Sequence, residues 1–289
     1  HVVKGRCLIC SNFTFDLCLN EIMGAWSVGA CVYVFDKETL LENGTQLVKE
    51  NEITRIALTA TQLSLIDSKD TPSLRMVVQA GEAFPADLAA EWTTRKSALV
   101  NSYGPTETNS ATMAFFTSGM KHPRTIGKPF PNMRGFIVGE IGEVVGSGLP
   151  GELIIAAGLQ VARGYLNRGG LSSTKFAAAT TRGNNSQLHS RLYHTGDLCR
   201  WLPDGSIEYL GRVDQQVKLR GMRIEPGEIE NVVAGHADVA QCVVMVRKLG
   251  AGESERKALV AYVVMMPLIA TSTDLRAHCV THLPTYMVP

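Results

Sequence analysis

The sequence predicts an α/β region, then a β-rich region, then a small α+β unit. Three observations support this order. Apolar runs alternate with helical segments over the first hundred residues, and glycines recur between short apolar runs from about residue 126 to residue 212. The pattern changes again at Asp214. We therefore expect two domains, residues 1–213 and 214–289, each with its own core.

The α/β region contains two apolar runs, residues 30–35 and 74–78, that are predicted to be short buried strands. Residues 85–92 predict a helix, because they begin with proline, which is favoured in the first helical turn. This alternation is typical of a mostly parallel sheet whose strands are connected by helices.

The β-rich region is predicted to form an antiparallel sheet or barrel, because glycine and proline turns separate its short apolar runs. These runs are residues 135–138, 151–155 and 205–210. Residues 182–186 contain arginine, glycine, asparagine and serine, and they predict a polar loop.

The last region is predicted to begin with a hairpin that pairs residues 216–219 with residues 222–225. A helix is expected at residues 226–233, because acidic residues favour the first helical turn. Two strands and a final helix complete a compact α+β unit, at residues 240–247, 258–265 and 273–282.

The composition is that of a cytoplasmic globular protein with no nucleic-acid or membrane partner. The 289 residues are 45% hydrophobic and 19% charged, and the net charge is +1. No apolar run is long enough to span a bilayer. The seven cysteines are scattered, and the Cys7–Cys10 pair has no second pair at zinc-site spacing, so reduced thiols are expected. The opening His1, without an initiator methionine or a signal peptide, suggests a piece of a longer protein.

A tight Gly104-Pro105 turn follows an apolar segment and holds its flanking side chains at the end of a strand. Thr106 offers a hydroxyl there, and Glu107 offers a hard oxygen ligand suited to Mg²⁺. The same segment is also compatible with an ordinary turn that carries a solvated glutamate.

Asp197 follows Thr195-Gly196, and its carboxylate could accept hydrogen bonds from both hydroxyls of a ribose. The alternative is a turn aspartate that caps its own backbone. Downstream, Tyr209 offers an aromatic face and Arg212 a fixed cation for a nucleotide. As isolated residues, Tyr209 reads as a strand core residue and Arg212 as a surface cation.

Taken in order, these segments closely resemble the adenylate-forming enzymes, and most closely the adenylation domains of nonribosomal peptide synthetases. The run YHTGDLCRWLPDGSIEYLGRVDQQVKLRG at residues 193–221 carries much of the resemblance, and residues 101–107 match NxYGPTE. The match extends over GEL and ARGY segments at residues 151–153 and 162–165, which look structural. The resemblance covers residues 13–289 and implies part of a large N-terminal domain, with α/β and β-barrel portions, followed by a small α+β domain.

The resemblance implies that ATP and Mg²⁺ bind in the first domain. Asn101 would meet the adenine edge, and Tyr103 would lie against the ring. Thr106 would contact the α-phosphate, and Glu107 would hold Mg²⁺. The resemblance further makes Asp197 the ribose ligand, with Tyr209 stacked on adenine and Arg212 at ribose or phosphate.

A further match, FTFDLCLNEIMGAWSVGA against FDxSxxExxxxLxxG, makes Asp16 the carboxylate that pairs with the α-amino group of an amino-acid substrate. A buried ammonium needs such an anion to offset its desolvation. Without the resemblance, Asp16 reads as a helix N-cap. The resemblance also suggests a rather polar pocket of mostly small residues, lined by Leu17, Asn20, Thr61, Val78, Ala80, Ser102, Ser110 and Ala111.

The resemblance also implies rotation of the small domain about a hinge at Asp214. One orientation forms the adenylate, and the other admits the phosphopantetheine thiol of a peptidyl carrier domain. Lys218 is similar to the lysine that faces the active site in the second state. Read alone, Asp214 and Lys218 are exposed loop and strand residues. A condensation domain is the expected neighbour in the parent protein.

Two functional segments of the family are missing, the phosphate loop and the C-terminal catalytic lysine, so we expect this chain alone to be inactive. One alternative is an acyl- or aryl-CoA ligase of the same superfamily, against which Asp16 argues. A second is a non-catalytic remnant that binds nucleotide or a partner protein. An unrelated β-rich binding module is the weakest alternative.

Overall fold

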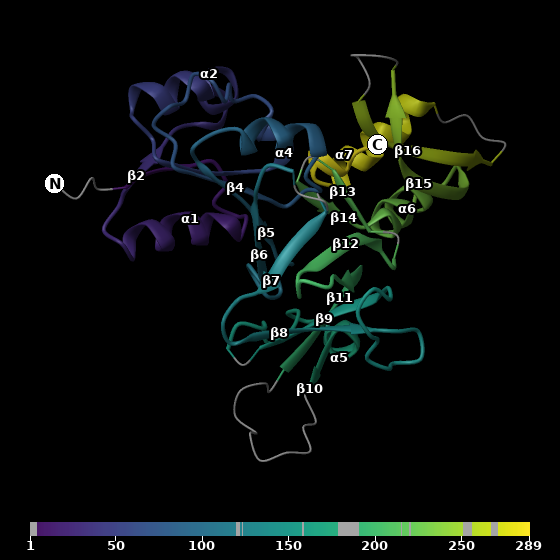
Figure 1. Ribbon diagram of the computed structural model, residues 1–289. Helices are drawn as coiled ribbons and strands as arrows, with labels where there is room; N and C mark the ends of the chain where they lie inside the picture. Colours follow the sequence, from purple (N-terminus) through teal and green to yellow (C-terminus); the bar gives the residue numbers. More distant parts are fainter. Residues whose placement is uncertain are drawn as a thin grey trace. The chain divides into compact units, whose positions relative to one another are not determined.

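The computed structural model describes residues 5–119, 122, 124–157, 159–178, 191–214, 216–219, 221–250, 256–266 and 271–289. The chain divides into two compact units, His1–Val213 and Asp214–Pro289 (Figure 1). The predicted polar loop at residues 182–186 lies outside the described residues.

The first unit begins with a five-stranded parallel sheet in the order β2-β1-β3-β4-β5. Its strands are β1 (Arg6–Ile9), β2 (Cys31–Val34), β3 (Arg55–Leu58), β4 (Met76–Ala80) and β5 (Ala98–Tyr103). The connecting helices are α1 (Leu17–Trp26), α2 (Lys37–Glu50), α3 (Ala60–Leu63) and α4 (Ala86–Thr93). The prediction of a parallel sheet with helical connections is confirmed.

Alternate residues of each strand pack on opposite faces of this sheet. Val77 and Leu99 belong to a core that contains Trp92 of α4, and the neighbouring Val78 and Val100 pack instead with Leu17 of α1. Figure 1 shows the same separation, with α1 on one side of the sheet and α2 and α4 on the other. The carboxyl ends of β4 and β5 therefore lie beside the start of α1.

The sheet continues past β5 as an antiparallel path, β5-β6-β7-β12-β11-β9-β8. Its strands are β6 (Thr112–Phe116), β7 (Thr125–Pro129), β8 (Met133–Val138), β9 (Gly151–Ala157), β11 (Arg191–Trp201) and β12 (Ile207–Arg212). The short helix α5 (Gly169–Lys175) leads into β10 (Phe176–Ala178), which pairs with β11. A second core forms around Ile137, Ile155 and Tyr193. The first two predicted regions are thus parts of one mixed sheet.

The described residues of the second unit form two separate antiparallel pairs and two helices. The hairpin pairs β13 (Val217–Leu219) with β14 (Met222–Ile224), and a ribbon pairs β15 (Val239–Leu249) with β16 (Arg256–Met265). Helices α6 (Pro226–Ala234) and α7 (Ser272–His282) and the 3₁₀ turn η2 (Thr285–Met287) complete it. A third core, which includes Ile229, Val244 and Leu259, holds the unit together. The mixed sheet and the small α+β unit together confirm the predicted fold class.

Some elements differ from the predictions. The predicted strand at residues 74–78 is shifted to Met76–Ala80, and β1, β3 and α2 were not predicted. The four-residue strands β1 and β3 are too short for a periodic signal, and their burial depends on neighbouring strands. All seven cysteines are free thiols. Within the described part of the chain, no helix has the length and apolar character needed to cross a membrane.

Gly104→Ala tests the packing of the loop after β5. A Cβ atom at residue 104 would lie 1.6 Å from the backbone oxygen of Asn109, so the loop has to move. We expect unfolding to become easier by on the order of 3 kcal/mol, as measured by urea denaturation. Gly146→Ala is the control, because its added Cβ meets no atom within 4 Å. Equal midpoints for the two variants would contradict this prediction.

Candidate functional site

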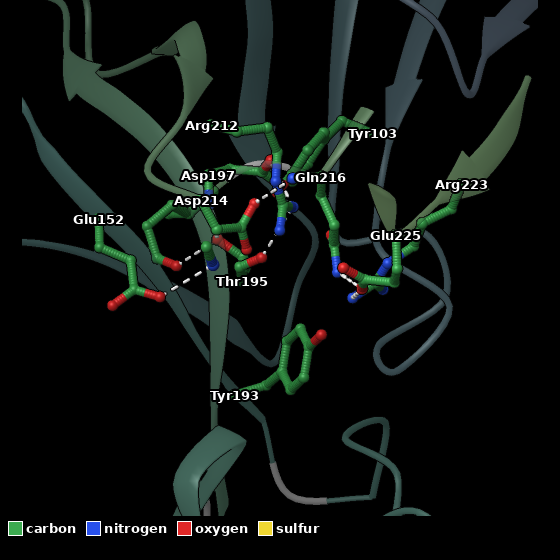
Figure 2. Close-up of polar contacts among 12 residues, drawn as sticks. Tyr103, Glu152, Tyr193, Thr195, Asp197, Arg212, Asp214, Gln216, Arg223 and Glu225 are labelled. Atoms are coloured by element: carbon green, nitrogen blue, oxygen red, sulfur yellow. Dashed lines mark hydrogen bonds and ion pairs between the residues drawn. The ribbon is translucent and has the colours of Figure 1, made fainter. Parts of the chain in front are cut away.

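A buried carboxylate, that of Asp197, joins β5 to the antiparallel part of the sheet (Figure 2). Asp197 in β11 lies directly opposite Arg212 in β12, and Arg212 Nη1 lies 3.0 Å from Asp197 Oδ1. The Tyr103 hydroxyl, at the end of β5, donates to Asp197 Oδ2. The side chains of Asp197 and Arg212 are only 3% and 12% exposed, so the ion pair is largely shielded from water.

This arrangement excludes two of the alternatives that the sequence left open. Asp197 lies within a strand and accepts hydrogen bonds from two side chains, so it is not a turn residue that caps its own backbone. Arg212 is largely buried, so it is not a surface cation. Burial, together with the neighbouring Asp197 charge, raises the pKa of the Tyr103 hydroxyl well above its ordinary value. Tyr103 therefore stays protonated and acts as the donor.

A second carboxylate, that of Glu152, supports the backbone beside Asp197. Glu152 Oε1 accepts from the backbone N–H of Gly196 at 2.8 Å, and Oε2 lies 3.1 Å from His194 Nδ1. Gly196 has φ of +70°, a conformation that favours glycine. Burial acts to raise the pKa of Glu152, but the hydrogen bonds from His194 and Gly196 outweigh it and hold the pKa below its ordinary value.

Asp16, Thr106 and Glu107 converge where α1 begins, beside the loop after β5. Asp16 occupies the N-cap position of α1, but its side chain makes no capping hydrogen bond. Burial raises the pKa of Asp16, a hydrogen bond with Thr106 opposes this, and the charge of Glu107 raises it further. This carboxylate is therefore an anion that an arriving cation would stabilise.

Glu107 is buried, and its carboxylate accepts a hydrogen bond from the Tyr165 hydroxyl at 2.5 Å. The structure describes no cluster of three or more His, Cys, Asp or Glu side chains that could hold a metal by themselves. Mg²⁺ in nucleotide sites usually takes one or two carboxylates and completes its shell with phosphate oxygens and water. Glu107, as a single carboxylate ligand, fits that need and does not make a closed protein cage.

Six of the remaining pocket candidates form a polar group and an apolar group. Asn20 Nδ2 donates to Ser110 Oγ at 2.9 Å, and the hydroxyl oxygens of Ser102 and Ser110 lie 3.1 Å apart. The apolar group packs against the carboxyl ends of β4 and β5 and comprises Leu17, Val78 and Ala80. Both groups include residues from α1, so this helix forms one wall beside the strand ends.

Other predicted site residues lie outside these clusters. Thr61 is exposed and hydrogen-bonds to Glu82, and the Asn101 amide nitrogen donates to the Thr125 carbonyl in the sheet. Ala111 is fully buried in the second core, and Tyr209 packs partly buried against that core, as the strand-core alternative expected.

Two further candidates belong to the second unit. Asp214 is its first residue and is exposed, and Lys218 lies in β13, with its side chain outside the described part of the structure. Near them, Gln216 Nε2 donates to Glu225 Oε1, which joins the start of the hairpin to the start of α6 (Figure 2).

Sequence reasoning missed two polar residues that contact the site. Glu152 and Tyr165 both lie in segments that looked structural, GEL and ARGY, yet they bond the Gly196 backbone and the Glu107 carboxylate. The available signal was the polar residue within each motif, a carboxylate in GEL and a phenol in ARGY. Their partners are separated from them by 44 and 58 positions, so only the folded chain shows the contacts.

The mixed sheet followed by a small α+β unit is the fold of adenylate-forming enzymes. The family model for AMP-binding enzymes matches residues 2–166, and the model for the AMP-binding enzyme C-terminal domain matches residues 228–289. The chain belongs to the AMP-binding enzyme family, and its recognition as part of a nonribosomal peptide synthetase adenylation domain is confirmed by its relatives.

Among curated relatives, tyrocidine synthase 3 of Brevibacillus parabrevis is 40% identical over 288 residues, and tyrocidine synthase 1 of the same organism is 37% identical over 291. The two matches cover 95% and 99% of this chain but only 4% and 26% of those proteins, so the chain spans about a quarter or less of their length.

Solved structures agree with the relatives. The Vibrio cholerae adenylation domain AlmE, in complex with glycyl-adenosine-5′-phosphate, has a TM-score of 0.85 and 26% identity. The match covers 99% of this chain and 55% of that one. An NRPS protein containing adenylation and PCP domains has a TM-score of 0.80 and 25% identity, over 95% of this chain and 48% of that one.

Glu152→Ala tests the support of the strand that carries Asp197. The substitution leaves the buried Gly196 N–H without its acceptor, which costs about 1–3 kcal/mol. Chemical denaturation measures the loss, with the exposed Glu140→Ala as the control. The folded-state pKa of Glu152 is depressed, so the stabilisation is present above its ordinary pKa of 4.5 and is lost as pH falls through the lower folded value. If Glu152→Ala lowered the free energy of unfolding by the same amount at neutral and at strongly acidic pH, the assignment of the Glu152 carboxylate as the stabilising acceptor would be contradicted.

Proposed function

We propose that this chain is part of an adenylation domain that activates an α-amino acid. The overall reaction joins the amino-acid carboxylate to the α-phosphate of ATP, and pyrophosphate leaves. The observation that carries the proposal is the convergence of Asp16, Thr106 and Glu107 at the end of β5. An anion for an ammonium group lies there beside a hydroxyl and a carboxylate suited to a phosphate and its Mg²⁺.

Asp197 and Arg212 would hold the nucleotide. The Asp197 carboxylate already accepts from Tyr103 and Arg212, but a carboxylate offers about four acceptor positions, so it can also accept from ribose hydroxyls. Because Arg212 is fixed opposite Asp197 by strand register and the Tyr103 hydroxyl reaches it from the end of β5, the carboxylate is oriented before a nucleotide arrives. Tyr103 and Tyr209 would flank the adenine, and Asn101 would meet its edge.

Asp16 would hold the amino acid by its α-ammonium group. Its carboxylate is partly buried and forms no ion pair with a cation among the described residues, and burial raises its pKa, so pairing with an ammonium relieves part of the desolvation cost. Thr106 would then position the α-phosphate next to the substrate carboxylate, and such positioning converts two reactants into one oriented pair. Mg²⁺ held by Glu107 would neutralise phosphate charge.

Transfer to a carrier thiol is the second half of the proposal. The solved NRPS protein of similar fold contains adenylation and PCP domains, which supports a phosphopantetheine-bearing carrier domain as the partner. Asp214 would be the hinge between the two units, and Lys218 would serve the second state. A condensation domain as a neighbour is the further expectation from the multidomain synthetases that this chain resembles.

Asp197→Ala is expected to weaken AMP binding by roughly 100-fold, because a carboxylate that accepts from two hydroxyls contributes two charge-assisted hydrogen bonds. Isothermal titration calorimetry with AMP measures the change. Asp87→Ala, at an exposed position of α4, makes the same substitution away from the site and should leave the affinity unchanged. Comparable affinities for the two variants would remove Asp197 from the nucleotide site.

Asp16→Asn tests the amino-acid assignment by amino-acid-dependent ATP–pyrophosphate exchange in the complete adenylation domain that contains these residues. We expect exchange with an α-amino acid to fall by roughly 100-fold, because the ammonium loses its counter-ion. Glu91→Gln, an exposed change in α4, is the control. Exchange only with acids that lack an amine would instead indicate an acyl- or aryl-acid ligase.

In the same exchange assay, the KM for the amino acid is expected to depend on pH. The anionic form of Asp16 binds the ammonium, so the KM for the amino acid should rise as pH falls through the raised pKa of Asp16, which lies above 3.8. An asparagine side chain does not titrate, so this acidic dependence should disappear in Asp16→Asn. If the variant kept the same acidic dependence, another group would be responsible.

A further inference from the structure

Asp16 and Asn20 lie four residues apart on α1 and therefore on the same face of the helix, about 5–6 Å apart. Asp16 faces Thr106 in the loop after β5, and Asn20 faces Asn109 and Ser110 farther along the same loop. A substrate held at Asp16 by its ammonium, with its carboxylate turned to Thr106, would extend its side chain about one helical turn along α1, toward Asn20.

The orientation of the Asn20 amide is fixed by its neighbours. The Asn109 side chain accepts from the backbone N–H of Ser110 at 2.5 Å, and because a backbone N–H only donates, the accepting atom is the amide oxygen. Asn20 lies 2.6 Å from that same oxygen and must present its NH₂ group to it. The NH₂ group also reaches Ser110 Oγ. The Asn20 amide oxygen consequently points away from these partners and has no hydrogen-bond donor among the described residues.

The two serines complete the inventory of hydrogen-bonding groups. Ser102 and Ser110 share one hydrogen bond, in which either hydroxyl is the donor. Two hydroxyl hydrogens are present and the shared bond uses one, so the pair keeps one O–H to donate elsewhere. These side chains thus present an acceptor, the Asn20 oxygen, together with a serine hydroxyl that can donate and serine lone pairs that can also accept.

The residues around Asn20, Ser102 and Ser110 favour a compact, uncharged substrate side chain. Leu17, Val78 and Ala80 line the neighbouring strand ends and are each at most 7% exposed. No charged side chain of the described residues forms a hydrogen bond with Asn20, Ser102 or Ser110. A charged substrate group would therefore lose its hydration without a counter-ion, and a purely apolar group would leave the donor and the acceptor unpaired.

We infer that the site selects an α-amino acid whose side chain ends in a hydroxyl or a carboxamide, since each of these groups both donates and accepts. Asn109 is the positioning residue for this selection, because it fixes the Asn20 amide and has no role in binding the nucleotide. The inference rests on the proposed function, because it takes Asp16 as the ammonium ligand.

The test uses non-hydrolysable aminoacyl-AMP analogues, the 5′-O-aminoacyl sulfamoyladenosines, titrated calorimetrically into the complete adenylation domain. Threonyl and valyl analogues have nearly the same shape, and so do asparaginyl and leucyl analogues, so each pair isolates hydrogen bonding. At least one polar member should bind about 100-fold more tightly than its apolar counterpart. Equal or tighter binding of both apolar members overturns the inference while leaving adenylation intact. Failure of every analogue to bind more tightly than AMP overturns both.

Two variants test the assigned residues. Asn20→Leu should bring the polar-to-apolar affinity ratio to within about threefold of one, because the amide acceptor is lost. Asn231→Leu, on the exposed surface of α6, is the matched control and should keep the parental ratio.

Asn109→Gly preserves the left-handed backbone at this position, where φ is 55°, and removes only the amide. It should lower the ratio and leave the affinity for AMP unchanged. An unaltered ratio in both the Asn20 and the Asn109 variants overturns the inference.

Discussion

The ion pair between Asp197 and Arg212, with the Tyr103 hydroxyl as third member, is the interaction on which the site depends. It connects β5, the last parallel strand, to β11 and β12, which lie farther along the antiparallel path of the same sheet. A buried carboxylate is costly unless it is paired and hydrogen-bonded, and here Arg212 of β12 and Tyr103 of β5 meet both conditions. The position of Asp197 is therefore set by the sheet and does not depend on a flexible loop.

Around this pair, the fold places different chemistry at the ends of neighbouring elements. The parallel strands β4 and β5 end beside α1, and the loop after β5 carries Thr106, Glu107 and Ser110 past the first two turns of that helix. Helix α1 consequently sets the separation between the two residues, because Asp16 is at its start and Asn20 lies one turn later. The spacing of an α-helix thus converts a sequence separation of four into a distance suited to an amino acid.

Supporting residues explain why the site depends on segments far apart in the sequence. Glu152 holds the backbone before Asp197, and Tyr165 holds the Glu107 carboxylate. Neither residue was expected to take part, because its motif looked purely structural. Their contacts restrict the orientation of the carboxylates, and such restriction is what allows a polar site to act without first reorganising.

The sequence by itself determined the order of the regions, the type of most elements and the family, because period, turn residues and ordered motifs are local properties. It also determined the residue types at Asp16, Glu107, Asp197 and Arg212. Only the tertiary structure decided which of these pair. Strand register set Asp197 opposite Arg212, and burial showed that Arg212 is not a surface cation. The tertiary structure also places Thr61 in a hydrogen bond with Glu82, apart from the other pocket candidates. The physical reason is that hydrogen bonding and desolvation depend on neighbours brought together by the whole sheet, which a local pattern does not encode.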